Sequence, residues 1–303
     1  MAKPVSNMAA SVRARLLTHA KANNLSFEQA LTNFVLQRLL YRLSASKHVD
    51  RFVLKGAMLL TSWFDDPLRP TRDIDFLGYG DPAPEVMTAL FAEIMSTAVE
   101  DDGVIFQPDK IRVETIREDV EYGGVRLKTV ALVGAATVPV TIDIGFGDAT
   151  TPEPETFDYP VLLDFPAPRL KGYARETVIA EKFQAMVALG MANTRIKDFY
   201  DVRALARGFD YDTPRLAAAV RATFDRRETE IPSEPPEALT EAFANDAGKI
   251  VLWKRFTEDL GEQEDFPTAI AALKAFLMPV ALDARALLEP QQGNKPEESA
   301  PPF

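Results

Sequence analysis

The chain has 303 residues, of which 47% are apolar, and 34 basic against 45 acidic residues give it a net charge of −11. This length allows one large domain or two ordinary ones with an ample core. The absence of cysteine excludes disulfides and thiolate metal sites, and two histidines nearly exclude a histidine-based metal site. The acidic balance would repel nucleic acid in bulk, so any RNA would have to meet a local basic patch. The sequence has no run of 18 apolar residues and no signal-peptide pattern, and we therefore expect a soluble, cytoplasmic protein without membrane contact.

Two helices are predicted at the N-terminus. Residues 8–23 form the first, and Ser26 with Gln29 three positions later is a capping-box pattern that opens a second helix through about residue 43. Apolar residues recur at helical spacing in the second helix, which predicts that one face is buried.

Arginines on these two helices allow two interpretations. Arg38 and Arg42 are four residues apart and share a helix face, with Arg13 and Arg15 upstream. They are either solvated or ion-paired side chains, or part of a functional basic patch.

A strand–glycine–strand segment follows. Residues 51–54 predict a first strand that ends near Gly56, residues 57–63 predict a short helix, and residues 65–70 contain two prolines and predict a loop. The second strand, residues 73–76, contains two aspartates.

These aspartates lie on one strand face. Residues i and i+2 of a strand point the same way, so Asp73 and Asp75 project together while Ile74 and Phe76 face a core. Paired carboxylates suit a hard cation such as Mg²⁺, and Gly56 would let the backbone approach a phosphate closely. On spacing alone, however, an Asp-x-Asp pattern most often marks a solvated strand face.

The next part of the chain predicts one helix and a set of strands joined by hairpins. The helix covers residues 84–99, the strands cover residues 111–116, 125–133 and 138–146, and the turns cover residues 121–124 and 134–136. Asp143 lies between Ile142 and Ile144, so strand alternation places it on the opposite face from these isoleucines, where burial would be costly without a partner.

The last part of the chain is predicted to be helical after a proline-rich connection at residues 160–168. Lys182 lies in line with an apolar stripe on the helix that begins near residue 176, as a snorkelling surface lysine often does. Asp198 and Asp201 share a face of the next helix, which ends at Gly208, and Asp201 can simply pair with a lysine four residues before it. Three more helices, without recognisable chemistry, are predicted at residues 214–225, 236–259 and 266–288, followed by a disordered tail at 289–303.

Several motifs in order resemble one family. They are KGAML at residues 55–59, RPTRDIDFL at 69–77, Glu181-Lys182, and RIKDFYD at 195–201. Together they are similar to the AbiEii/AbiGii toxin family of nucleotidyltransferases, which includes the MenT toxins. The resemblance runs from about residue 11 to residue 206.

The resemblance implies an α+β fold with a polymerase-β-like mixed sheet. On this basis we expect an N-terminal helical segment at residues 1–50, the nucleotidyltransferase core at 51–168, a C-terminal helical domain at 169–288 and the tail at 289–303. It also implies an NTP substrate, a cognate antitoxin and an acceptor that is most simply RNA, at a tRNA 3′ end.

The resemblance also assigns roles to residues. Asp73, Asp75 and Asp143 would be the catalytic carboxylates. Asp73 and Asp75 would hold Mg²⁺ or Mn²⁺, and Asp143 would be a third metal ligand or the base for the acceptor hydroxyl, with Asp148 as a weaker rival to Asp143. Lys182 and Asp198 would complete the catalytic set. The NTP would be bound by five residues, namely Lys55, Gly56, Ala57, Arg72 and Lys182.

The sequence departs from the family at one point and leaves the reaction open. Many relatives carry Gly-Gly or Gly-Ser where this chain has Gly56-Ala57, so a hydroxyl contact to phosphate is absent. Two other hypotheses stay open: a nucleotide- or partner-binding regulatory module without turnover, and nucleotidylation of a protein, which the acidic surface mildly favours.

Overall fold

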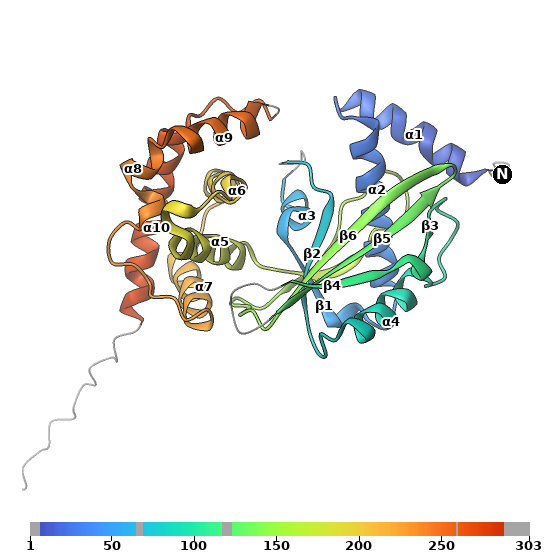
Figure 1. Cartoon of the computed structure of the whole chain (residues 1–303), viewed down its shortest axis with the longest axis horizontal. Coiled ribbons are helices and arrows are strands. Elements are labelled where there is room, and N and C mark those ends of the chain that lie inside the picture. The colour runs from blue at the N-terminus through green and yellow to red at the C-terminus, as the bar shows by residue number, and fades with distance from the viewer. Residues whose placement is uncertain (1–6, 65–68, 117–122, 259, 288–303) are drawn as a thin grey trace, which may run out of the picture. The chain divides into compact units, whose positions relative to one another are not determined.

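The computed structural model describes residues 7–64, 69–116, 123–258 and 260–287. The chain divides into two compact units, Met1–Val178 and Ile179–Phe303. The first contains a mixed sheet with helices against it, and the described residues of the second form helices and loops (Figure 1). The predicted α+β class is confirmed.

The sheet of the first unit has eight strands in the order β3-β5-β6-β2-β1-β8-β7, and β4 also pairs with β5. The strands are β1 (Phe52–Lys55), β2 (Asp73–Gly78), β3 (Ile105–Phe106), β4 (Arg112–Ile116), β5 (Gly124–Val133), β6 (Ala136–Phe146), β7 (Glu155–Asp158) and β8 (Arg169–Gly172). The β2–β6 and β1–β8 pairs are parallel and the others antiparallel. The sheet is therefore mixed, as predicted, but β3, β7 and β8 were not predicted.

Strand alternation separates a buried face of this sheet from a polar one. Ile74 and Phe76 of β2, and Ile142 and Ile144 of β6, are almost completely buried. The intervening residues of these strands point to the other face. The predicted turn between β5 and β6 is confirmed as a two-residue hairpin loop that begins at Gly134 with φ +61°.

Helices cover the sheet of the first unit. They are α1 (Met8–Ala22), α2 (Phe27–Ser44), α3 (Gly56–Thr61) and α4 (Pro84–Met95), with short 3₁₀ turns η1 (Val49–Arg51) and η2 (Pro108–Lys110). The capping box at Ser26 and Gln29 is confirmed. α1 packs next to β5, α2 next to β6 and β8, and α4 next to β4 (Figure 1).

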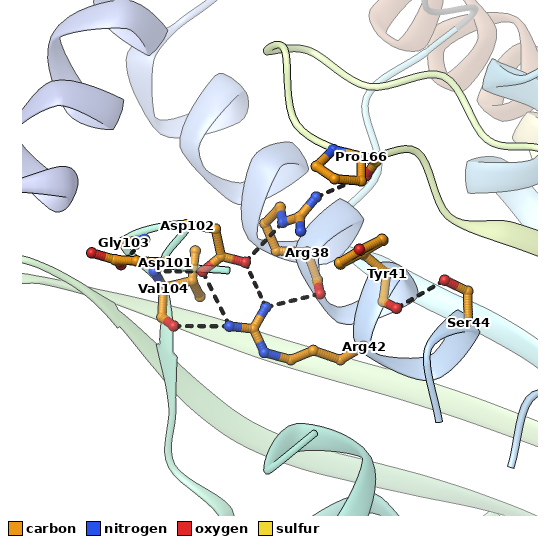
Figure 2. Close-up of polar contacts among 9 residues, drawn as sticks. All are labelled: Arg38, Tyr41, Arg42, Ser44, Asp101, Asp102, Gly103, Val104 and Pro166. Atoms are coloured by element: carbon orange, nitrogen blue, oxygen red, sulfur yellow. Dashed lines mark hydrogen bonds and ion pairs between the residues drawn. The ribbon is translucent and has the colours of Figure 1, made fainter. Parts of the chain in front are cut away.

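Two arginines of α2 form a buried ion cluster, shown in Figure 2. Arg38 donates from Nε to Asp102 at 2.8 Å, and Arg42 donates to both oxygens of the same carboxylate at 2.7 and 3.1 Å. Arg38 also donates to the Pro166 carbonyl, and Arg42 to that of Val104. The cluster therefore connects α2 to two loops that are distant in sequence.

The basic-patch interpretation is consequently wrong for Arg38 and Arg42, because their side chains are at most 8% exposed. Burial alone would raise the pKa of Asp102, but hydrogen bonds from Arg42 and Arg38 outweigh it and lower the pKa. Upstream, Arg15 pairs with Asp164 and Arg13 lies over the Phe27 ring.

The second unit is built from helices packed around α10. They are α6 (Ile196–Gly208), α7 (Thr213–Arg226), α8 (Glu241–Ala244), α9 (Ala247–Glu258) and α10 (Phe266–Ala286), with η3 (Gly190–Ala192) and η4 (Glu237–Leu239). α5 (Arg175–Leu189) begins in the first unit and continues into the second. Among the described residues only α10 is long and apolar enough to cross a membrane, and it packs against α6 and α7, so its composition is that of a core helix.

One helix predicted in the second unit is wrong. Within the predicted range 236–259, the described residues form η4, α8 and α9 rather than one helix. Thr240 caps the N-terminus of α8, and Asp246 accepts a hydrogen bond from the Lys249 amide at the start of α9. A new helix therefore begins at each of these two side-chain caps. Residues 65–68, 121–122, 259 and 288–303, which belong to the predicted loop, turn, helix ends and tail, lie outside the described residues.

Candidate active site

Charged side chains form one row across four strands of the polar face. Lys55 of β1 is paired in register with Asp75 of β2, Asp75 with Asp143 of β6, and Asp143 with Arg126 of β5. Adjacent strands are about 4.8 Å apart, so these neighbours are in reach of one another. The sheet thus places Asp75 beside Asp143. The basic side chain of Lys55 lies next to Asp75, and that of Arg126 lies next to Asp143.

Gly56 supports the carboxylate of Asp75. Its φ is +68°, and a Cβ built there would lie 1.9 Å from Oδ2 of Asp75. Only glycine combines this backbone conformation with such a close approach. The predicted association of the glycine turn with the aspartate strand is therefore present, and Asp75 is fixed against the start of α3.

Asp143 is bound on its other side by Arg126. The guanidinium donates from Nε and Nη2 to the two carboxylate oxygens at 2.7 and 2.6 Å, which is bidentate geometry. The hydrogen bonds and charge of Asp143 raise the pKa of Arg126, with a smaller contribution from Asp73. Asp73 precedes Asp75 by two residues on the same strand face, and it is exposed.

Lys55 brings a further carboxylate to the row. Its ammonium lies 2.9 Å from Oδ2 of Asp148 and 5.5 Å from the centre of the Tyr173 ring. Asp148, which the sequence offered as an alternative to Asp143, thus lies beside Lys55, the residue in register with Asp75. Both are less than one fifth exposed.

The other predicted nucleotide-binding residues lie close in sequence to this row. Ala57 is 5% exposed, so only its backbone could reach a ligand. Arg72 is 76% exposed and lies 3.7 Å from an oxygen of Glu28. At that exposure the pair contributes little, and the guanidinium is available to another anion.

Lys182 and Asp198 come together in the second unit. The Lys182 ammonium lies 2.5 Å from Asp198 and 2.9 Å from Asp201, and Arg195 contacts the second oxygen of Asp198 at 2.6 Å. Burial would lower the pKa of Lys182, but Asp201 and Asp198 outweigh it and raise the pKa. Lys182 thus lies between two carboxylates and stays protonated.

The donor set of the row suits a hard cation in composition. Carboxylate oxygen is the ligand that Mg²⁺ and Mn²⁺ prefer, and Asp73, Asp75 and Asp143 share one face. In the part of the chain that the structure describes, however, no three acidic or histidine side chains are arranged to hold a metal ion. Arg126 instead occupies one side of Asp143.

Arg126 and Glu114 are the members of this site that sequence reasoning missed. Glu114 of β4 is in register with Arg126, so it extends the row by one strand. The alternation of Arg126 and Lys128 with buried residues in β5 was the available signal. It becomes informative only when β5 is known to pair with β6.

Comparison with known proteins finds solved structures with a similar fold. The fold is similar to the crystal structure of a "putative nucleotidyltransferase" from H. pylori, with a TM-score of 0.51 and 15% identity over 87% of this chain and 99% of that one. It is also similar to JHP933 from Helicobacter pylori, with a TM-score of 0.49 and 16% identity over 86% and 95% of the two chains. No curated protein matches the chain. The first of these likenesses shows a shared fold.

The sequence defines the family more closely. Residues 38–275 match the model of the nucleotidyl transferase AbiEii toxin of type IV toxin–antitoxin systems. The chain belongs to this family, and the predicted resemblance is confirmed. Membership makes the protein a nucleotidyltransferase toxin, and it implies an NTP substrate and an antitoxin partner.

Proposed function

We propose that the protein uses a divalent cation to transfer NMP from an NTP to an RNA acceptor, with the 3′ end of tRNA as the acceptor and a cognate antitoxin opposing its toxicity. The observation that carries the proposal is the register that places Asp75 beside Asp143, with Gly56 against the Asp75 carboxylate. Such a row offers, at one place, carboxylates that can hold a cation and a glycine backbone that a phosphate can approach closely.

The reaction assigns each side chain a task. The 3′-hydroxyl oxygen of the acceptor forms a bond to the α-phosphorus, the bond from that phosphorus to the α–β bridging oxygen breaks, pyrophosphate leaves and the hydroxyl proton passes to a base or water. Bound Mg²⁺ or Mn²⁺ would supply neutralisation of phosphate charge. Asp73 and Asp75 would hold that cation, and Lys55 and Arg72 would attract the triphosphate.

The contact with Arg126 favours one of two roles for Asp143. Both carboxylate oxygens already accept hydrogen bonds from the guanidinium. A carboxylate retains further lone pairs that a cation can use, whereas a proton would compete with the guanidinium. We therefore assign Asp143 as a third ligand rather than as the base for the acceptor hydroxyl.

The family motif supports a role for Lys182 in neutralising the charge that builds on the leaving pyrophosphate. Asp198 and Asp201 keep Lys182 protonated, as its raised pKa indicates. Asp198 would then act by positioning the lysine.

The test is transfer of label from each α-³²P-labelled NTP to total RNA or to cell lysate, followed by digestion with RNase or protease. We expect RNase-sensitive label that requires Mg²⁺ or Mn²⁺ and that disappears in Asp75→Asn. Protease-sensitive label would instead support protein nucleotidylation, which the net charge of −11 favours.

A non-catalytic binding module is the second candidate, and the lack of a preformed metal cluster among the described residues favours it. Retained growth inhibition by Asp75→Asn, without label transfer by the wild-type protein, would establish that candidate.

A further inference from the structure

Basic side chains gather on the sheet beside the carboxylate row. Lys110 of η2, Arg112 of β4 and Lys128 of β5 are exposed, and they line a surface hollow of about 380 Å³. We call these three residues the basic strip. Asp109 is the acidic residue among those that line the hollow.

Strand register connects the basic strip to the candidate active site. Arg112 is paired with Lys128, Lys128 with Thr141 of β6, and Thr141 with Asp73 of β2. This second row runs beside the one that contains Arg126 and Asp143. At about 4.8 Å per strand, it leads from Arg112 to Asp73 over roughly 14 Å.

The strip carries three positive charges against the two negative charges of Asp109 and Glu114. Among the described residues, Lys110 and Arg112 make no ion pair. Lys128 pairs with Glu114 at 2.9 Å, but both side chains are about half exposed, so the pair is weak and exchangeable. In a chain with a net charge of −11, exposed cations that lead to paired carboxylates point to an extended polyanion rather than to a protein surface.

The lining of the hollow indicates how such a ligand would be held. Besides the charged residues it is formed by aliphatic side chains and Thr129, without an aromatic ring on which a base could stack. Contacts of this kind go to phosphate and position a strand without reading its sequence.

We propose that the basic strip binds the sugar–phosphate backbone of the RNA acceptor and leads its 3′ end to Asp143 and Asp75. The inference rests on the proposed function. When the acceptor binds, Lys128 exchanges its contact with Glu114 for a contact with a phosphate. Glu114 therefore competes with the RNA phosphate for Lys128.

The experiment measures binding of fluorescein-labelled bulk tRNA by anisotropy across a salt series, with every variant made in an Asp75→Asn background and without NTP. We expect Arg112→Ala/Lys128→Ala to bind roughly tenfold more weakly or worse at low salt, and to reduce the slope of log K against log salt by about 1.5. Lys47→Ala/Arg169→Ala is the matched control, because it removes the same charge from two exposed, ion-paired cations outside the strip. We expect little change in that control.

Glu114→Gln gives a test of opposite sign. It releases Lys128 and removes a negative charge, so we expect tighter tRNA binding and a steeper salt dependence. A merely destabilised sheet would not produce tighter binding.

Unchanged tRNA binding in the double variant, or an equal loss in the control, would overturn the inference even if label transfer to RNA is observed. With Asp75 retained, a loss of protein labelling in lysate by Arg112→Ala/Lys128→Ala, without a loss of tRNA binding, would assign the strip to a protein acceptor and overturn the inference as well. Binding is measured without turnover. Absence of label transfer would therefore contradict the proposed function but would not contradict the binding of tRNA by the strip.

Discussion

Arg126 and Asp143 face each other on adjacent strands, and the guanidinium donates to both carboxylate oxygens at 2.7 and 2.6 Å. Asp75 lies in register on the other side of Asp143. Two carboxylates about 5 Å apart repel by roughly 3 kcal/mol at an effective dielectric near 20. When no metal ion is bound, the charge of Arg126 therefore reduces the repulsion between Asp75 and Asp143. A bound metal ion would reduce the same repulsion.

The first prediction concerns Arg126→Ala. We expect it to lower the melting temperature without divalent ions, by an amount that corresponds to about 1–2 kcal/mol, and to increase the stabilisation that Mg²⁺ provides. Thermal melting over a MgCl₂ titration measures both effects. Arg169→Ala, which removes an exposed partner of Asp158, is the control. An unchanged Mg²⁺ response in Arg126→Ala would show that Arg126 does not compete with a cation at Asp143.

The second prediction concerns Gly56→Ala. The new Cβ would meet the Asp75 carboxylate at 1.9 Å and would require a left-handed backbone at φ +68°. We expect loss of label transfer together with destabilisation of about 1–3 kcal/mol, measured by urea unfolding. Gly134→Ala is a matched control, because its φ is +61° but its nearest neighbour would be 3.7 Å away. Equal effects in the two variants would mean that backbone strain, and not displacement of Asp75, is responsible.

The third prediction concerns the buried ion cluster. Asp102→Asn leaves Arg38 and Arg42 buried without a counter-charge, and we expect a loss of about 3–5 kcal/mol in the free energy of unfolding. Asp158→Asn removes one partner of an exposed pair and is expected to cost less than about 1 kcal/mol. Similar unfolding midpoints for the two variants would contradict a structural role for the cluster.

The fourth prediction is a pH dependence from the same cluster. The pKa of Asp102 is lowered in the folded protein from its ordinary value of 3.8. Its stabilising contribution is therefore complete above that value and is lost as the pH falls through the lower folded pKa. We expect Arg38→Met, which keeps only the Arg42 contact, to lose less stability than the wild type between pH 5 and 2, to be measured by urea unfolding at each pH. A steeper loss in Arg38→Met would contradict this assignment.

The fifth prediction separates structure from catalysis at Lys182. Lys182→Met removes the ammonium that lies 2.9 Å from the buried Asp201 carboxylate and is expected to destabilise the second unit. Lys182→Met/Asp201→Asn removes one positive and one negative charge together, and Asp198 keeps Arg195. We expect the double variant to recover stability in thermal melting but not label transfer. Recovery of both would show that Lys182 is purely structural.

The sequence was sufficient for the parts of the fold that depend on local patterns. The capping box at Ser26, the alternation in β2 and β6, and the hairpin turn at Gly134 each follow from neighbouring residues and are confirmed. The family was predicted from ordered motifs and is confirmed as well.

What could not be predicted depends on contacts between distant segments. β8 is four residues long and is a strand because β1 and β7 flank it, while Arg38 and Arg42 are buried because Asp102 reaches them from another loop. Likewise, the contact of Arg126 with Asp143 requires the register of β5 on β6. The roles of the site residues stay predictions.

The parallel pairing of β2 with β6 has a consequence for synthesis of the toxin. Asp143 reaches Asp75 only after α4 and the three strands β3, β4 and β5 have been made, because β6 follows them in the chain. A ribosome-bound polypeptide that has not yet released β6 therefore lacks the paired carboxylates. In such a nascent chain the candidate active site is incomplete.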